Sequence, residues 1–244
     1  MRRSLILVVR PMRIVTWNCN GALRKKLAAL LALQADIYII QECEDPERST
    51  DNNYKQWASG SLWTGDNKNR GLGVFSSSER LASLDWESNG LQLFLPFTVN
   101  ESLTILGVWT RQANSPNFRY IGQAWKYLQA HKDKLPQTNA LVLGDFNSNT
   151  RWDEWDRWWN HSDVVRELSE SGFTSIYHHC NNEQQGQETQ NTFFMYRRPD
   201  KHYHIDYAFA SANIIQSSTI TIGNAEDWLE FSDHLPIVVE FSLV

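Results

Sequence analysis

Residues 140–147 read Ala140-Leu141-Val142-Leu143-Gly144-Asp145-Phe146-Asn147, and this stretch decides the kind of fold the chain must build. Four apolar residues in a row are expected for a strand that is buried on both faces. Gly144 lets the backbone approach a ligand closely. Asp145 and Asn147 stand two residues apart and so face the same way in an extended chain. The stretch predicts a buried strand whose end presents a carboxylate and a carboxamide together.

Apolar and β-branched runs of this kind recur along the chain, separated by segments with helical spacing. We expect strands at residues 14–17, 37–40, 72–75, 103–109, 140–143, 192–196, 205–210, 214–222 and 236–241. Helical patterns cover residues 23–31 and 118–131, and a third helix is expected from Ser162, as its N-cap, to the residue before Gly172. The alternation of strands and helices indicates a layered α/β or α+β domain whose sheets are covered by helices.

The composition is that of a globular protein. The chain has 244 residues, 41% of them hydrophobic, and we expect an N-terminal extension over residues 1–11 and a single domain over residues 12–244. The apolar part of the extension is too short for a signal peptide, so the cytoplasm is the expected location. The net charge of −5 counts against a protein that grips long duplex DNA without specificity, because such binding usually needs a basic surface.

Four more polar blocks stand at the ends of apolar runs: Thr16-Trp17-Asn18, Gln41-Glu42, His204-Ile205-Asp206-Tyr207 and Ser232-Asp233-His234. Asn18 and Glu42 end two strands joined by a helix, and a right-handed crossover leaves both at one edge of a parallel pair. Glu42 is then an anionic ligand for Mg²⁺ or Mn²⁺, with Asn18 as a neutral oxygen beside it. Taken alone, Asn18 would suit a helix-capping turn, and Glu42 would suit a solvated strand end equally well.

The last two blocks predict a carboxylate–imidazole pair. Asp206 lies in an apolar stretch, so its burial requires a partner, and His234 is the natural candidate. Asp206 would fix the tautomer of His234 and raise its basicity, so the imidazole can take a proton from water or contact a phosphate. Asp233 would complete the ligand set of the cation. Together the blocks predict metal-dependent hydrolysis of a phosphoester.

The ordered set of blocks resembles the endonuclease/exonuclease/phosphatase superfamily, whose deoxyribonuclease I-like members include abasic-site endonucleases and tyrosyl-DNA phosphodiesterases. Members carry Thr-Trp-Asn, Gln-Glu, Gly-Asp-x-Asn, an Ile-Asp-Tyr-like strand and Ser-Asp-His in this order, and the match runs from Met12 to the end of the chain. The resemblance implies a four-layered α/β (α+β) sandwich, with two central mixed β-sheets flanked by helices. It also implies in-line attack of an activated water on a phosphodiester, with Mg²⁺ or Mn²⁺.

Matching the blocks to the family by position divides the residues into two sets, those that bind the metal and those that take part in the reaction, which we call the reacting group. The resemblance implies that Glu42 is the principal metal ligand and that Asn18 and Asp233 lie close to the metal. The catalytic residues that it implies are Asp145, Asn147, Asp206 and His234. Whether Asp145 or His234 is the general base stays open at this point.

Substrate contacts are expected where the chain departs from the family. Trp109 stands where members commonly carry a Tyr or His, and its indole can donate one N–H but cannot act as an acid or base. Either Arg111, Gln112 or Asn114 would then substitute for that residue, or protonation of the leaving group would fall to metal-bound water. Arg197 and Arg198 suit contact with a phosphate backbone. The segment from residue 151 to 159 holds four Trp, which favours either a base-stacking or lipid-facing rim or an irregular set of core aromatics.

Three functions follow from these observations. The first is a monomeric, metal-dependent endo- or exonuclease that acts on DNA. The alternative is a phosphatase or phosphodiesterase of small phosphorylated compounds or lipids, which the acidic composition favours. The third is a non-catalytic binding module, which the intact set of charged residues disfavours because keeping them buried is costly.

Overall fold

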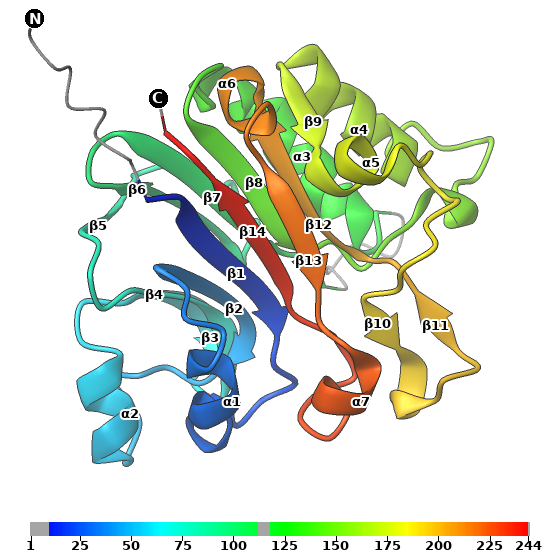
Figure 1. Ribbon diagram of the computed structural model, residues 1–244. Coiled ribbons are helices and arrows are strands. Elements are labelled where there is room, and N and C mark those ends of the chain that lie inside the picture. Colours follow the sequence, from blue (N-terminus) through cyan, green and yellow to red (C-terminus); the bar gives the residue numbers. More distant parts are fainter. Residues whose placement is uncertain (1–9, 112–117, 244) are drawn as a thin grey trace, which may run out of the picture.

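The computed structural model describes residues 10–111 and 118–243, and two face-to-face β-sheets form its centre (Figure 1). The strands of the first sheet are β1 (Met12–Asn18), β2 (Ile37–Cys43), β3 (Leu62–Asn67), β4 (Arg70–Phe75), β13 (Thr219–Ile222) and β14 (Ile237–Phe241). Those of the second are β5 (Leu81–Ser83), β6 (Phe94–Val99), β7 (Leu103–Trp109), β8 (Ala140–Asp145), β9 (Phe173–Ser175) and β12 (Asp206–Ser211). A separate hairpin consists of β10 (Phe193–Phe194) and β11 (His202–Tyr203).

Both sheets are mixed. Their strand orders are β13-β14-β1-β2-β4-β3 and β5-β6-β7-β8-β12-β9. β1 pairs in parallel with β2, and β7 pairs in parallel with β8, whereas the other pairs in the two sheets are antiparallel. The parallel pairing of β1 and β2 agrees with the strand–helix–strand unit expected from the sequence.

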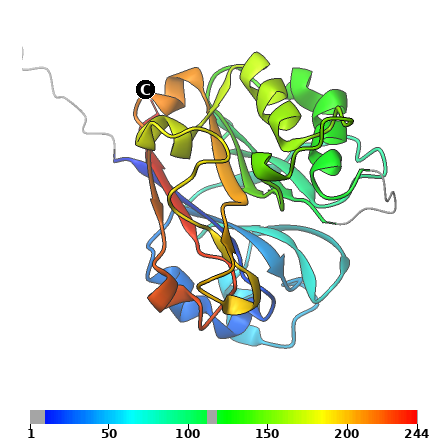
Figure 2. The ribbon, with the colours of Figure 1, turned by 90° about the vertical axis from the view of Figure 1, so that its right-hand side faces the viewer.

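Helices cover the outer faces of the sheets, as Figure 2 shows from the side. The α-helices are α1 (Leu27–Leu31), α2 (Asn52–Trp57), α3 (Ile121–His131), α4 (His161–Glu170), α5 (Ile176–Asn181), α6 (Ala212–Ile215) and α7 (Ala225–Trp228). Short 3₁₀ segments are η1 (Leu23–Lys25), η2 (Lys132–Lys134), η3 (Thr150–Trp152) and η4 (Met195–Arg197). α1, α2 and α7 pack on the first sheet, and α3 and α4 pack on the second.

Strand alternation explains the layers. In β1, Ile14 points into the core between the sheets, while Val15 and Trp17 point to the helices outside. In β8, Leu141 and Leu143 face the other sheet, and Val142 faces the helices. Three apolar clusters therefore form, one between the sheets and one under each helical layer. The predicted four-layered sandwich with two central mixed sheets is confirmed.

Several boundaries differ from the sequence prediction. The strand expected over residues 192–196 is confined to Phe193–Phe194, because η4 begins at Met195. Residues 214–222 do not form one strand, because α6 ends at Ile215 and β13 begins at Thr219. Ile214 and Ile215 are both buried between the sheets, which a helical turn allows and a strand, with its alternating sides, does not. The third helix begins two residues earlier than expected, because Asn160 rather than Ser162 is its N-cap, in a capping box with Asp163.

Residues 1–9 of the predicted extension lie outside the described residues, and β1 begins at Met12, two residues before the strand expected at residues 14–17. Across the described part of the chain, no helix combines the length and the apolar character that crossing a bilayer would require.

Candidate active site

The polar blocks meet at one end of the space between the two sheets. Asn18 ends β1, Asp145 ends β8 and Asp206 begins β12. Each of these residues falls in the alternation on the side that faces the opposite sheet, so the three side chains point into the interior. The Asn18 carboxamide donates a hydrogen bond to Asp145 Oδ2 (3.0 Å), which ties the first sheet to the second.

Asp145 is fully buried and lies at the centre of this cluster. Asn147 donates to its two carboxylate oxygens through its backbone N–H (2.8 Å) and its side-chain Nδ2 (2.8 Å). Asn147 has a positive φ of 46°, so the chain turns back toward Asp145 instead of continuing as a strand. Its Nδ2 also donates to the carbonyl oxygen of Thr110 (2.9 Å), which anchors the turn to the end of β7. The carboxylate is therefore held in one orientation.

Asp206 and His234 form the predicted pair. His234 Nδ1 lies 3.0 Å from Asp206 Oδ2, and its Nε2 lies 4.0 Å from Asp145 Oδ2. In residues 10–111 and 118–243, Asp145, Asp206 and His234 are the one group of three His, Cys, Asp or Glu residues whose ligand atoms all lie within 4.8 Å of one another. The Ser232 hydroxyl accepts from the backbone N–H of His234 (3.0 Å) and donates to the carbonyl of Asn18 (2.7 Å). The turn before Pro236 thus places the imidazole between two carboxylates.

The pKa values of Asp145 and His234 are both raised in this group. Burial raises the pKa of Asp145 to about 7, although the nearby imidazole of His234 opposes that rise. Burial alone would lower the pKa of His234, but the carboxylates of Asp206 and Asp145 outweigh it and raise this pKa to about 10. Near neutral pH the imidazole is therefore a cation, and Asp145 can exchange a proton. This combination suits a carboxylate base beside a cationic hydrogen-bond donor.

Glu42 lies beside Asn18 at the rim of the cluster. Its Oε1 accepts from Asn18 Nδ2 (3.3 Å), and its other oxygen pairs with the guanidinium of Arg70. A β-bulge interrupts the pairing of β2 with β4 here, and Glu42 has a φ of 60°. Bulges re-aim side chains in this way. Glu42 therefore points toward Asn18, and the following residue, Cys43, returns to the buried outer face.

The three residues predicted to hold a metal are linked by hydrogen bonds at the rim of the cluster. Asp233 Oδ1 accepts from the side chain of Asn20 (3.1 Å), and the backbone N–H of Asn20 donates to Asn18 Oδ1 (3.0 Å). Asn20 thus links Asp233 to Asn18. Sequence reasoning missed Asn20 and Arg70, although Asn20 follows the Trp-Asn block by two residues. Arg70, the first residue of β4, gave no signal in the sequence, because it is 28 residues from Glu42.

The predicted substrate residues lie in different surroundings. Trp109 is 5% exposed and packs in the core between the sheets, which leaves little of it for a substrate. Arg111 pairs with Asp66 on the surface (3.1 and 3.2 Å), and Gln112 and Asn114 fall outside the described residues. Arg197 donates to the carbonyls of Glu230 and Phe231, and Arg198 pairs with Asp200.

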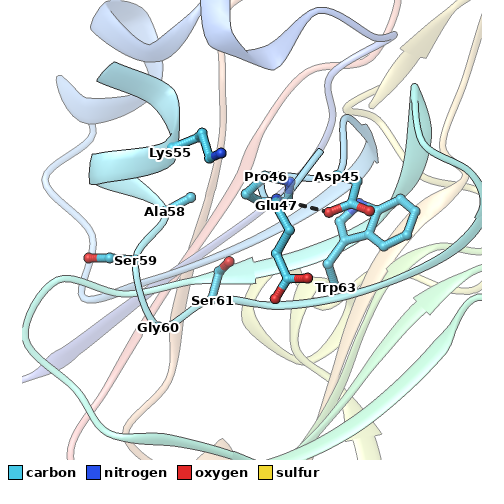
Figure 3. Close-up of a pocket in the computed structure, with 9 residues that line it drawn as sticks. All are labelled: Asp45, Pro46, Glu47, Lys55, Ala58, Ser59, Gly60, Ser61 and Trp63. Atoms are coloured by element: carbon cyan, nitrogen blue, oxygen red, sulfur yellow. Dashed lines mark hydrogen bonds between the residues drawn. The ribbon is translucent and has the colours of Figure 1, made fainter. Parts of the chain in front are cut away.

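A separate pocket of about 370 Å³ lies beyond the end of β2, between α2 and the start of β3 (Figure 3). Its lining residues are Asp45, Pro46, Glu47, Lys55, Ala58, Ser59, Gly60, Ser61 and Trp63. Figure 3 shows the indole of Trp63 opposite Lys55 of α2 and Ala58, which follows the helix. None of the predicted catalytic residues lines this pocket.

Comparisons with solved structures support the fold. A 3′ phosphatase from Neisseria bound to a product DNA hairpin is 19% identical to the chain, with a TM-score of 0.72, and the match covers 95% of this chain and 100% of that one. An AP endonuclease from Archaeoglobus fulgidus is 17% identical, with a TM-score of 0.71 and the same coverage. A 3′-5′ exonuclease from Neisseria meningitidis is 20% identical, with a TM-score of 0.70 and the same coverage.

No curated protein sequence matches the chain. The profile of the "Endonuclease/Exonuclease/phosphatase family" matches residues 15–234, a span that starts within β1 and ends at His234. Every polar block of the candidate active site lies inside this span. The chain therefore belongs to the endonuclease/exonuclease/phosphatase family and is a hydrolase of phosphoester bonds.

Proposed function

We propose that the protein is a nuclease that hydrolyses phosphodiester bonds of DNA with Mg²⁺ or Mn²⁺. The observation that carries the proposal is the position of Asp145, which is buried, hydrogen-bonded by Asn18 and Asn147, and 4.0 Å from a cationic His234. A base with a pKa of about 7 beside a fixed cation is suited to the attack of water on an anionic phosphate.

Each residue of the cluster then has a role. Asp145 accepts a proton from the attacking water, because its pKa of about 7 lets it ionise near neutral pH. The imidazolium of His234 donates through Nε2 toward the phosphate, and Asp206 holds its orientation through Nδ1. Asn147 keeps the carboxylate of Asp145 in place. The cationic state of His234 makes Asp145, rather than His234, the general base in this proposal.

The residues at the rim fit a hard divalent cation. Glu42 supplies a carboxylate, Asn18 a carboxamide oxygen, and Asp233 a second carboxylate nearby, which is the oxygen donor set that Mg²⁺ and Mn²⁺ prefer. Glu42 already attracts a positive group, since the guanidinium of Arg70 pairs with it. When bound, the cation would supply electrostatic stabilisation of the charge that develops on the phosphate.

The proposal that the substrate is DNA rests on the solved structures that share this fold. One similar structure is described as bound to a product DNA hairpin, and another as an AP endonuclease. A second candidate, a phosphatase of small phosphorylated compounds, draws on the net charge of −5 and on the description of a similar structure as a 3′ phosphatase. The acidic charge weakens long-range attraction to long DNA but not attraction to a small phosphate ester that reaches the cation.

We expect hydrolysis to depend on added divalent metal and to be strongest on a DNA substrate. Excess EDTA should lower the rate by at least about 100-fold, because the charge on the phosphate loses its main stabilising partner, and Mg²⁺ or Mn²⁺ should restore it. The measurement is initial rate on four substrates: plasmid, abasic-site duplex, single-stranded oligonucleotide and a small phosphodiester. Rapid turnover of the small diester beside intact nucleic acids would favour the second candidate. A rate that EDTA leaves unchanged would contradict both.

The rate should depend on pH in a way that distinguishes the two possible bases. With Asp145 as the base, kcat/KM rises as pH passes about 7, where its carboxylate ionises, and falls near pH 10, where His234 loses its proton. In Asn18→Ala the rising limb should move to higher pH, because the hydrogen bond that lowers the pKa of Asp145 is gone. Initial rates measured at saturating metal test this. A rising limb near pH 10 in the wild type would instead identify His234 as the base.

A further inference from the structure

Arg70 contacts two of the side chains at the rim where the cation is expected to bind. Its guanidinium pairs with Oε2 of Glu42 through Nη1, and its Nη2 donates to Oδ1 of Asn20 (3.5 Å). Asn20 in turn contacts Asn18 and Asp233. One guanidinium is therefore connected, directly or through Asn20, to all three residues that we expect to hold the cation.

The backbone that carries Arg70 is fixed to the segment that follows Glu42. Arg70 begins β4 and lies opposite Asn67 of β3, across the turn that joins the two strands. The carbonyl of Lys68 in this turn accepts a hydrogen bond from the backbone N–H of Asp45 (2.8 Å), which lies just beyond β2. The turn and the end of β2 therefore keep a fixed separation, and the side chain of Arg70 reaches across it to Glu42.

The ion pair divides the two carboxylate oxygens of Glu42 between two sides. Oε2 accepts from Arg70, whereas Oε1 lies 3.3 Å from Nδ2 of Asn18. A glutamate side chain has several rotatable bonds, so a partner on one oxygen restricts the positions that the other oxygen can take. The carboxylates that bind metals in proteins are themselves held by hydrogen bonds in this way. Oε1 is thereby kept on the side of Asn18, where the cation is expected.

The positive charge of Arg70 has a second effect, because by itself it repels a cation. The side chain of Arg70 is 52% exposed, whereas that of Glu42 is 17% exposed, so water screens the guanidinium more than it screens the carboxylate. The contact that orients Glu42 is direct and does not pass through solvent. The orienting contact therefore outweighs the screened repulsion, and Arg70 favours binding of the cation.

We propose that Arg70 is a positioning residue of the metal centre, whose guanidinium holds Glu42 so that Oε1 is free to bind the cation. The inference rests on the dependence on Mg²⁺ or Mn²⁺ that belongs to the proposed function. It adds to the metal centre a residue that lies outside all the polar blocks of the sequence. Arg70 acts through Glu42 and touches neither the cation nor the phosphate.

The test measures binding of Mn²⁺ to the protein without substrate, by titration with free Mn²⁺ followed by electron paramagnetic resonance. Arg70→Met keeps a long apolar stem but removes the guanidinium. Its dissociation constant for Mn²⁺ should rise about tenfold, since loss of a partner that orients a metal ligand typically costs about 10- to 100-fold in affinity. Arg70→Lys keeps a charged donor and should recover part of the loss.

Arg80→Met is the matched control for the loss of a guanidinium. Arg80 forms an exposed ion pair with Glu101 (2.9 Å), and neither residue belongs to a polar block. This variant removes the same group from an arginine–glutamate pair elsewhere on the surface, so it should bind Mn²⁺ with the affinity of the wild type.

A double variant tests whether Arg70 acts through Glu42. Glu42→Gln alone should weaken Mn²⁺ binding more than Arg70→Met does, because it removes the charge of the ligand itself. Adding Arg70→Met to Glu42→Gln should then change the dissociation constant by less than about twofold, because the two side chains act as one unit. Thermal unfolding of each variant shows that it is folded.

The possible results separate the role of Arg70 from the proposed function. An unchanged or lower dissociation constant in Arg70→Met, or a full further loss in the double variant, would overturn the positioning role. Slower hydrolysis by Arg70→Met with unchanged Mn²⁺ binding would also overturn it, and would place the guanidinium on the substrate instead. A wild type that binds no Mn²⁺ would overturn the metal dependence of the proposed function itself.

Discussion

Asp145→Asn is expected to lower kcat by about 10³-fold on whichever substrate the protein hydrolyses best. The change keeps the shape of the side chain but removes its proton acceptor, and loss of a general base typically costs about 10²- to 10⁴-fold. It also places a new amide where Asn18 and Asn147 already donate, so at least one donor loses its acceptor. No other described carboxylate receives hydrogen bonds from both of these side chains.

The measurement is steady-state kinetics at saturating metal, with thermal unfolding to show that the variant is folded. Asp133→Asn is the matched control, because Asp133 is exposed on η2 and far in sequence from every polar block. We expect the control to retain wild-type kcat. If Asp145→Asn kept a third or more of the activity, the assignment of the base would be wrong and His234 would have to be reconsidered.

The inner strands and the reacting group could be predicted from the sequence because their signals are local. β7 was expected at its observed bounds, since Leu103–Trp109 is apolar apart from Thr104 and both faces of its sheet are covered. The pairing of Asp206 with His234 followed from a simple requirement, that a carboxylate in an apolar stretch needs a partner. Patterns of this kind depend on neighbours in the chain and on burial alone.

Some strands gave no clear signal because their pairing is long-range. β6 contains Pro96, and proline argues against an inner strand because it has no N–H to donate. The structure resolves this conflict, since Pro96 lies just beyond the part of β6 that pairs with the short strand β5. The carbonyl of Pro96 accepts a hydrogen bond from the backbone N–H of Leu84, which follows β5. The missing N–H of Pro96 therefore also faces β5, at the point where the pairing of β5 with β6 ends.

The detailed geometry of the site could not be predicted from the sequence, because it also depends on contacts between segments that are far apart in the chain. Asp145 and Asn147 were expected to share a face of an extended chain, but the left-handed φ of Asn147 turns the chain so that it bonds Asp145 directly. Glu42 owes its direction to a bulge that exists only because β2 pairs with β4. The contact between Asn18 and Asp145 joins two sheets that no local pattern places against each other.

Gly144→Ala is expected to have the largest effect on stability, because the backbone at this position leaves no room for a side chain. Gly144 has a φ of 147°, which is strained for any residue with a Cβ, and a Cβ built there would lie 1.9 Å from the carbonyl oxygen of Val108. Val108 is its partner on the parallel strand β7, and Tyr207 of β12 pairs on the other side. An added methyl must therefore push β7 and β8 apart in the middle of the second sheet.

We expect Gly144→Ala to lower the free energy of unfolding by at least about 3 kcal/mol, or to prevent folding, since backbone strain and overpacking add at one site. Gly172→Ala is the matched control: its φ of 85° is also positive, but nothing lies within 4 Å of its added Cβ, so a loss of about 1 kcal/mol is expected. Chemical denaturation of both variants measures the difference. Similar losses would mean that the close approach of Val108 does not constrain the strand. A selective loss would show that the glycine is required for β8 to run tightly beside β7, which is what delivers Asp145 to Asn18 and His234.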